Sequence, residues 1–255
     1  MRIVTLNTWK NEGDYARRLA LMARGLAALS PDVVCLQECF AARGADTAAE
    51  LAGAMRLALH ARPARRKRRE HGGVAVTSTS GLAILARRAG EEAGLELVSD
   101  PADGERIAQR LDVAGEAGPL RVLNLHLTHL RGEAAAELRA RQLVQALDWA
   151  RGGPVLAAGD FNAPLEAPEL AVLVEQAVPP DRPEAAYPRR ATLQGGRVGA
   201  SLAAAATIDH AVLIDPTGAW RVRRRFLALD RPDAQGWFPS DHAAVVVDLE
   251  PAYGL

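Results

Sequence analysis

Short apolar runs recur along the chain, and their lengths suit the buried strands of a β-sheet. We expect strands at residues 3–6, 33–36, 74–76, 82–85, 120–125, 155–158, 208–214 and 243–249. Between Leu95 and Val122 the pattern predicts a meander, in which a turn at residues 115–119 joins two strands. Strands are therefore expected along most of the chain.

Helical periodicity separates several of these runs. Leu19, Met22 and Leu26 recur at spacings of three and four residues and predict a helix that ends near Leu29. Helices are also expected over residues 47–59 and 133–150. Residues 62–73 and 179–206 follow neither pattern, so we expect loops there, placed over a functional site.

Helices that alternate with strands and hairpins favour α/β layers with mixed sheets over a purely parallel sheet. A chain of 255 residues can bury roughly 70–75% of the surface that its unfolded form exposes, which is enough for one large core. The sequence contains no internal repeat and no interdomain linker. We therefore expect a single domain that spans residues 1–255.

The sequence also bears on location. It contains no run of about 18 uncharged apolar residues, which excludes a membrane-spanning helix. The first ten residues are predicted to begin a strand, and they lack the apolar stretch and cleavage site of a secretion signal. We expect a monomeric, cytoplasmic protein.

The net charge is +0, so the chain as a whole does not attract nucleic acid or anionic lipid. One basic run is concentrated at Arg62, Arg65, Arg66, Lys67, Arg68 and Arg69. This run is either a solvated loop or a loop that grips phosphate and favours polyanionic substrates. Cys35 and Cys39 would lie on one side of a strand, and we expect both to be small buried side chains rather than a disulfide or a zinc site.

Polar side chains occur where several apolar strands end. They are Asn7, Gln37, Glu38, Asn124, His126, Asp160, Asn162, Asp209, Asp241 and His242. A charged or amide group beside a buried strand is costly unless it is paired or binds a metal. The recurrence of such groups indicates that strand ends converge on one cation site, and their oxygen atoms suit Mg²⁺ or Mn²⁺.

Each of these residues also has an ordinary structural interpretation. Asp160 and Asn162 are typical of turns, and Asn7 could bond to its local backbone. Asn124 could be a polar strand residue that is hydrogen-bonded into the core. His129 is expected either at the rim of the site or exposed to solvent, and His210 is expected to point to the opposite face from Asp209. The co-occurrence of the motifs favours the functional interpretation.

The ordered series TLNTW, LQE, GLAILAR, NLHLTH, GDFNAP, IDHAVL and SDHAAVVVDL resembles the endonuclease/exonuclease/phosphatase superfamily. That superfamily includes deoxyribonuclease I, exonuclease III, neutral sphingomyelinases and inositol polyphosphate phosphatases. The resemblance extends over residues 2–249. It implies a four-layer α/β sandwich, in which two mixed β-sheets pack face to face with helices outside. Metal and substrate would bind at one edge of the sheets.

The resemblance also implies roles for the acidic residues. Glu38 is the expected principal metal ligand, assisted by Asn7. Asp241 is expected near the metal or at a second metal position. Asp160 would orient or deprotonate the attacking water.

Other roles fall to amide and imidazole groups. Asn162 would hold a phosphoryl oxygen, and His242 would hydrogen-bond to the phosphoryl group. His126 matches a histidine that deoxyribonuclease I and the sphingomyelinases carry after the central strand. Asp209 would fix the tautomer of either His242 or His126, and the resemblance leaves this choice open.

These features predict a Mg²⁺- or Mn²⁺-dependent hydrolase that cleaves a phosphodiester or a phosphomonoester by in-line attack of water. GDFN is followed here by Ala163-Pro164 rather than the Ile-Ala-His of exonuclease III-type enzymes, which disfavours a repair endonuclease. A small or lipid-derived phosphate ester is the favoured substrate. Asn124 and the run Arg65, Arg66, Arg68 and Arg69 are candidates for contacting it. The alternatives are a nuclease, non-specific or structure-selective, and a non-catalytic phosphate-binding module.

Overall fold

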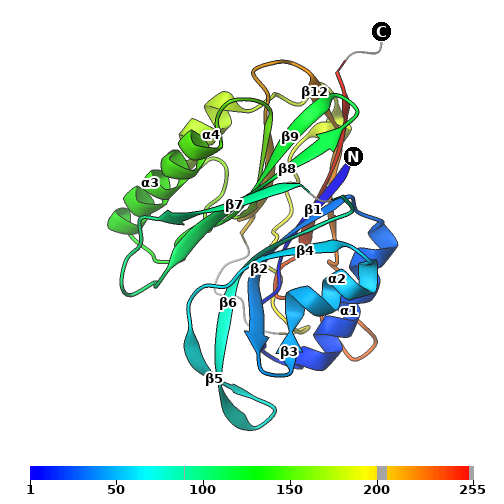
Figure 1. Cartoon of the computed structure of the whole chain (residues 1–255), viewed down its shortest axis with the longest axis vertical. Coiled ribbons are helices and arrows are strands. Elements are labelled where there is room, and N and C mark those ends of the chain that lie inside the picture. The colour runs from blue at the N-terminus through cyan, green and yellow to red at the C-terminus, as the bar shows by residue number, and fades with distance from the viewer. Residues whose placement is uncertain (89, 200–205, 253–255) are drawn as a thin grey trace.

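The computed structural model describes residues 1–88, 90–199 and 206–252 (Figure 1). In this part of the chain, an eight-stranded and a five-stranded sheet are accompanied by four α-helices. The first sheet contains β1 (Arg2–Asn7), β2 (Val33–Ala42), β3 (Ala45–Asp46), β4 (Ala58–Arg62), β5 (Lys67–His71), β6 (Val74–Ala86), β12 (Trp220–Ala228) and β13 (Ala244–Pro251). The second contains β7 (Glu91–Leu97), β8 (Arg106–Gly115), β9 (Gly118–His126), β10 (Val155–Asp160) and β11 (Asp209–Ile214).

Both sheets are mixed. The first has the order β12-β13-β1-β2-β6-β4, with β3 beside β2 and β5 beside β6, and the second has the order β11-β10-β9-β8-β7. The β1–β2 and β9–β10 pairs are parallel, whereas the other named pairs are antiparallel. β9 and β10 end side by side at His126 and Asp160, and β1 ends at Asn7 beside Gln37 of β2, which continues to Ala42. This register brings the residues to one edge.

Four layers follow from where the apolar side chains lie. One buried cluster, which includes Ile3, Leu156 and Val247, fills the space between the sheets. The helices α1 (Tyr15–Leu29) and α2 (Thr47–Met55) cover the outer face of the first sheet, while α3 (Glu133–Ala150) and α4 (Ala171–Gln176) lie against the second (Figure 1). The expected four-layer α/β sandwich is confirmed.

The helix α1 shows how local sequence fixes an element. Asp14 is its N-cap, and the side chain accepts a hydrogen bond from the backbone N–H of Arg17. Met22 and Leu26, which define the predicted apolar stripe, are fully buried against the first sheet. Arg18 is also fully buried, although its charge would place it in solvent.

A β-bulge interrupts β2 at the site edge. Leu36 faces Ala83 and Cys39 faces Gly81 on β6, so β2 carries one extra residue. Glu38, within the bulge, has a φ of 55°. The extra residue changes the alternation of the strand. Cys35 therefore lies between the sheets while Cys39 lies under the helices, and the prediction that they share one side was wrong. Both are free and buried, as expected.

Several expected boundaries were also wrong. The helix predicted at residues 47–59 ends at Met55, because Arg56 adopts a left-handed conformation and β4 then pairs with β6. The runs at residues 74–76 and 82–85 belong to one strand, β6, whose serine- and threonine-rich centre pairs with β2 and β5. The strand β12 was not predicted, since its basic residues mask the alternation.

The two expected loops differ in outcome. Arg62 ends β4 and residues 63–66 are irregular, as expected, but the rest of the first segment forms β5 and a tight turn into β6, at which Gly72 and Gly73 have φ angles of 59° and 78°. Positive φ at two successive positions suits a hairpin turn and explains the glycine pair. Residues 179–199 are mainly irregular, as expected, apart from a short 3₁₀ turn at Pro183–Ala185 and isolated bridges. Residues 200–205 lie outside the described part.

None of the helices in the described part combines the length with the apolar character that crossing a bilayer requires.

Candidate active site

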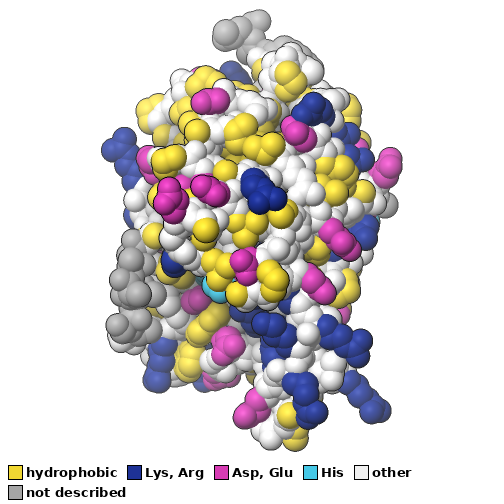
Figure 2. Space-filling model, turned by 90° about the vertical axis from the view of Figure 1, so that its left-hand side faces the viewer, with side chains coloured by type: hydrophobic (Ala, Val, Ile, Leu, Met, Phe, Trp, Pro, Cys, Tyr) yellow, Lys and Arg dark blue, Asp and Glu magenta, His cyan; other side chains and the backbone are white. Residues whose placement is uncertain are grey.

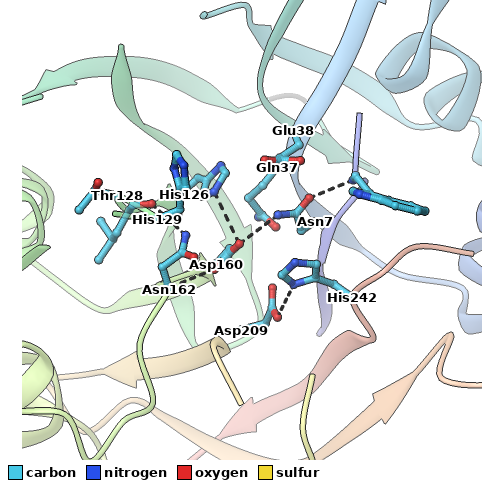
Figure 3. Close-up of polar contacts among 12 residues, drawn as sticks. Asn7, Gln37, Glu38, His126, Thr128, His129, Asp160, Asn162, Asp209 and His242 are labelled. Carbon is cyan, nitrogen blue, oxygen red and sulfur yellow. Dashed lines mark hydrogen bonds and ion pairs between the residues drawn. The ribbon is translucent and has the colours of Figure 1, made fainter. Parts of the chain in front are cut away.

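The polar residues predicted to converge come from both sheets and meet at one edge of the sandwich (Figure 3). Asn7 at the end of β1 pairs with Gln37 of β2, at the bulge in that strand. Asp160 at the end of β10 lies between its strand partners, His126 on β9 and Asp209 on β11. The register of the two parallel pairs therefore sets this arrangement.

Several polar contacts cross between the sheets near this edge. Asn7 Nδ2 donates to Asp160 Oδ2 at 3.0 Å, and Asp209 Oδ2 lies 2.8 Å from Nδ1 of His242. Gln37 Nε2 donates to Asn124 Oδ1 at 2.7 Å. These contacts fix the separation of the two sheets where the site lies.

Asp160 is held on both carboxylate oxygens. Besides Asn7, the backbone N–H of Asn162 donates to Oδ1 at 2.9 Å. The preceding residue must be glycine, because Gly159 has a φ of 146° and an added Cβ would lie 1.9 Å from Leu125 O. Burial, followed by the negative charge of Asp209, raises the pKa of Asp160 to about 7.

His242 forms a hydrogen-bonded pair with Asp209. Burial lowers the pKa of this histidine, but the charge and hydrogen bond of Asp209 outweigh it and raise the pKa well above its usual value. Because Nδ1 faces Asp209, the other ring nitrogen, Nε2, is directed away from it and lies 3.8 Å from Asp241 Oδ1. Of the two histidines left open by the sequence, Asp209 thus contacts His242.

His126 occupies the other side of Asp160, with Nε2 at 3.6 Å from Asp160 Oδ2. Its pKa is lowered well below the usual value, first by burial and then by the positive charges of Arg106 and Arg65. His126 is therefore neutral near pH 7, whereas His242 carries a proton on both nitrogens. The two imidazoles of the site differ in charge state.

Glu38 and Lys10 form an ion pair, with Lys10 Nζ 2.8 Å from Glu38 Oε1. Lys10 was missed by sequence reasoning. It sits in a turn where both Trp9 and Lys10 have positive φ, 56° and 43°. Such angles are uncommon for large side chains and require support from neighbouring groups.

Arg18 supplies that support. Its guanidinium donates to the backbone carbonyls of Thr8, Trp9, Lys10, Glu12 and Pro239. It also lies 4.7 Å from the ring centroid of Trp9. Arg18 thereby joins the turn after β1 to the segment before Asp241. The one sign of this role in the sequence is that Arg18 lies on the otherwise apolar face of its helix.

Thr192, which the sequence did not single out either, ties the start of β11 to the residue after His242. Its Oγ1 accepts hydrogen bonds from the backbone N–H groups of Ile208 and Asp209, and its carbonyl accepts from Ala243 N. Burial, with the nearby charges of Glu38 and Asp209 adding to it, raises the pKa of Asp241 to about 6.

The donor set fits a hard divalent cation. Glu38, Asp160, Asp209 and Asp241 offer carboxylate oxygens. Burial first, and neighbouring negative charge second, raise the pKa of Asp160 and of Asp241. Asp209 Oδ1 is buried and has no hydrogen-bond partner in the described residues. One ligand atom each from Asp160, Asp209 and His242 lie within 4.8 Å of one another.

The side chain of Asn7 is less available as a metal ligand than expected. Its Oδ1 accepts a hydrogen bond from Trp9 N at 3.0 Å, and its Nδ2 is bound to Asp160. One lone pair of the carbonyl oxygen remains for a cation.

Two groups of predicted substrate contacts require correction. Asn124 is fully buried and its amide donates to the carbonyls of Leu36 and Ala83, so it links the sheets and offers nothing to a substrate. Arg66, which precedes β5, and Arg68 within it are both exposed, so their side chains face solvent rather than the site.

Arg65 and Arg69 are partly buried and lie toward the site. Nη1 and Nη2 of Arg69 donate to the hydroxyls of Ser78 and Ser80. The basic run is therefore divided between an inner and an outer pair. Figure 2 shows Lys and Arg side chains gathered around this hairpin at the bottom of the molecule, below a histidine on the same face.

His129 lies at the rim, as expected. Its Nδ1 is 2.7 Å from Asp103 Oδ1, and Asp103 in turn binds Arg106. His210 points away from the site, with Nε2 at 2.9 Å from Ala163 O.

The fold and the site together define a class of protein, namely a two-sheet α/β sandwich with a cluster of acidic, amide and imidazole groups at one edge. A sequence model of the endonuclease/exonuclease/phosphatase family matches residues 4–243. The chain belongs to this family, whose members are hydrolases that act on phosphate esters and generally depend on a divalent metal.

Solved structures share the fold. An endonuclease/exonuclease/phosphatase from Beutenbergia cavernae has a TM-score of 0.70 at 20% identity, over 98% of this chain and 71% of that one. A mannosyl-6-phosphatase from Bacteroides thetaiotaomicron has a TM-score of 0.67 at 21% identity, over 98% and 99%. The human Nocturnin catalytic domain with bound sulfate has a TM-score of 0.68 at 18% identity, over 98% and 93%. A search of curated proteins gives no match.

Proposed function

We propose that the chain is a divalent-metal-dependent phosphoesterase that hydrolyses a phosphodiester or a phosphomonoester by in-line attack of water. One observation supports this most strongly. Asp160 lies between His126, whose Nε2 is 3.6 Å from Asp160 Oδ2, and His242, which Asp209 orients, and one ligand atom each from Asp160, Asp209 and His242 lie within 4.8 Å of one another. In-line attack needs a group to handle water, stabilisation of the phosphoryl oxygens and help for the leaving oxygen.

The roles follow from the contacts. Asp160 orients the attacking water and accepts its proton, for which a pKa near neutrality is well suited. His242 donates from Nε2 to a phosphoryl oxygen, because Asp209 holds the tautomer. Asn162 uses one amide N–H on Leu127 O and has the other available for the phosphoryl group.

His126, being neutral, hydrogen-bonds to the leaving oxygen without adding a second positive charge beside His242. Glu38 and Asp241, assisted by Oδ1 of Asn7, would hold Mg²⁺ or Mn²⁺, which supplies Lewis-acid polarisation of a phosphoryl oxygen when bound.

A small or lipid-derived phosphate ester is the substrate that we favour, since the net charge is +0 and only 4% of residues are aromatic. A nuclease is the second candidate. It is favoured by Arg66 and Arg68, whose exposed side chains on the hairpin could contact a nucleic acid backbone.

The test is a panel of substrates with added Mg²⁺ or Mn²⁺, namely an aryl phosphodiester, an aryl phosphomonoester, sphingomyelin and plasmid DNA. We expect turnover of at least one small or lipid ester, its loss with a chelator and its loss in Asp160→Asn. Plasmid nicking alone would favour the nuclease. Absence of turnover with every substrate and metal would contradict the proposal and favour a non-catalytic phosphate-binding module.

A further inference from the structure

Lys10 is unusual in its residue type as well as in its position. Lys10 and Lys67 are the two lysines of this sequence, in which Lys and Arg together number 31. Lys67 is exposed on β5, whereas Lys10 faces Glu38, the expected principal metal ligand, with Nζ 2.8 Å from Oε1. The lysine at the site therefore contacts the carboxylate on which metal binding is expected to depend.

The backbone holds this ion pair in place from both sides. Glu38 lies in the bulge of β2 with a φ of 55°, and Trp9 and Lys10 have φ angles of 56° and 43°. The turn is fixed to the end of β1, because Asn7 Oδ1 accepts from Trp9 N and Arg18 Nη2 donates to the carbonyls of Trp9 and Lys10. Such backbone conformations are uncommon, persist where the surrounding structure imposes them, and cluster at functional sites.

An ammonium group suits a contact that is later broken. Lysine carries a point charge on a flexible four-carbon stem, whereas the planar guanidinium of arginine binds a carboxylate through two parallel hydrogen bonds. The side chains of Lys10 and Glu38 are 24% and 12% exposed, so either can exchange this contact for another. An arginine at position 10 would hold Glu38 more firmly against a competing cation.

Lys10 competes with a divalent cation for Glu38. Both bind carboxylate oxygens, and simultaneous binding to one carboxylate brings two positive charges close together, where they repel. The negative charge of Glu38 also acts on Asp241, so the two carboxylates lie near each other. A divalent cation can use both carboxylates, whereas Lys10 contacts Glu38, and this difference favours the exchange.

The displaced ammonium stays beside the reacting groups. The turn that carries Lys10 is fixed to β1, so the ammonium moves only as far as its own side chain allows. Its positive charge already reaches His126, the residue assigned to the leaving oxygen, and contributes to lowering the pKa of that histidine. Once freed from Glu38, the ammonium can donate to an anionic oxygen bound at the site.

We propose that Lys10 pairs with Glu38 until a divalent cation binds, and that the released ammonium then donates a hydrogen bond to an oxygen of the substrate's phosphate group. This inference rests on the proposed function and adds a substrate-binding residue to it. Lys10 thereby makes phosphate binding depend on prior cation binding.

The first measurement is cation binding, which does not depend on turnover. Mn²⁺ is titrated into wild type and Lys10→Met, and the free ion is followed by its electron paramagnetic resonance signal. We expect Lys10→Met to bind Mn²⁺ about fivefold to tenfold more tightly, because Glu38 no longer has a competing partner.

Two further variants test the cause of that gain. Arg69 lies close enough to Glu38 for their charges to interact, but its guanidinium donates to Ser78 and Ser80. Arg69→Met therefore removes a nearby charge without freeing Glu38, and should change Mn²⁺ affinity by about twofold at most. Lys10→Gln keeps a hydrogen-bond donor but loses the charge, so it should give a smaller gain, and it repeats the test if methionine disturbs the turn.

The second measurement is phosphate binding. Inorganic phosphate is titrated calorimetrically into wild type and Lys10→Met, each saturated with Mg²⁺. We expect the variant to bind phosphate about tenfold more weakly, the effect of losing one charge-assisted hydrogen bond. Opposite changes for the two ligands identify the exchange, since a merely structural role of Lys10 would weaken the binding of both.

The outcomes separate the two proposals. Unchanged or weaker Mn²⁺ binding in both Lys10 variants, an equal gain in Arg69→Met, or unchanged phosphate binding in Lys10→Met would overturn the inference. If an ester is nevertheless hydrolysed, the proposed function stands without the exchange. Opposite changes in Mn²⁺ and phosphate affinity, with no turnover of any ester, would support the exchange and contradict the proposed hydrolysis.

Discussion

Charged residues gather near two opposite ends of the part of the first sheet formed by β1, β2 and β13, and the two groups of charges are paired differently. At the site end, buried carboxylates stand close together. At the far end, where the N-terminus lies (Figure 1), each carboxylate meets arginine. Arg2 Nε and Arg224 Nε lie 2.7 and 2.6 Å from the two oxygens of Asp248, and Asp32 accepts from the backbone N–H of Arg2.

The pKa values of the carboxyl groups differ between the two ends in the same way. Burial and neighbouring negative charge raise the pKa of Asp160 to about 7 and of Asp241 to about 6. Burial also acts to raise the pKa of Asp248, but hydrogen bonds from Arg2 and Arg224 outweigh it and lower the pKa below its usual value. At the far end, arginines therefore stabilise the ionised carboxylate of Asp248. At the site end, the protein's own groups do not fully neutralise the ionised carboxylates.

The largest expected difference between the ends is in activity. We predict that Asp160→Asn lowers kcat by roughly 10²–10⁴, because the group that handles the water is lost. Asp248→Asn, which makes the same chemical change at the far end, should retain near-native kcat. Both are measured with excess Mg²⁺ on the best ester substrate. Near-native turnover by Asp160→Asn would remove this residue from the mechanism.

We expect metal binding to stabilise the folded protein through the residues at the site end and not through those at the far end. At a hundredfold excess over its Kd, Mg²⁺ should stabilise the wild type by about 2.7 kcal/mol, a rise in Tm of roughly 5–10 °C. Glu38→Gln should lose most of this rise, while Asp248→Asn should keep it. Thermal unfolding with and without a chelator provides the measurement. An equal rise in Glu38→Gln would show that the ion binds elsewhere.

Charge accumulation at the site predicts a stabilising mutation. The folded-state pKa of Asp160, about 7, exceeds the unfolded value of about 3.9. Ionisation therefore destabilises the fold, and stability falls as the pH rises from about 4 to about 7. In excess chelator, Asp160→Asn should raise Tm at pH 8 by at least about 2–4 °C, equivalent to about 1 kcal/mol, and by little near pH 4. A lower Tm at pH 8 would contradict this account.

The smallest predicted effect has the opposite sign. Because the folded-state pKa of Asp248 is lowered, its contribution to stability is present above about pH 4 and is lost as the pH falls through the folded-state value. Asp248→Asn should lower Tm at pH 7 by about 2–4 °C, and the deficit should shrink below about pH 4. A deficit that stays constant down to pH 3 would mean that the arginine pairs do not stabilise the fold.

The sequence predicted the layers and the convergence of the site because both depend on local pattern. The apolar runs locate β1, β9, β10 and β13, and the polar residues that follow or precede them mark the shared edge. Once the order of the strands is known, Asp160, Asp209 and His242 are expected to lie close together, as they do.

Other features depend on contacts between distant segments, and the sequence could not predict them. The bulge at Glu38 arises from the register between β2 and β6. Lys10 reaches Glu38 only because Arg18 holds an unfavourable turn. The half-buried positions of Arg65 and Arg69 and the exposed positions of Arg66 and Arg68 depend on how residues 63–66 and β5 lie against β6, which the composition of the run concealed.

The change of alternation in β2 has a practical consequence for thiol chemistry. Cys35 and Cys39 lie in different cores on the two faces of one sheet, so oxidation cannot join them while the fold is intact. Burial raises the pKa of both thiols, so neither reacts readily with alkylating reagents in the native state. Single-cysteine variants would therefore report separately, through their labelling rates, on the opening of the space between the sheets and of the layer beneath the helices.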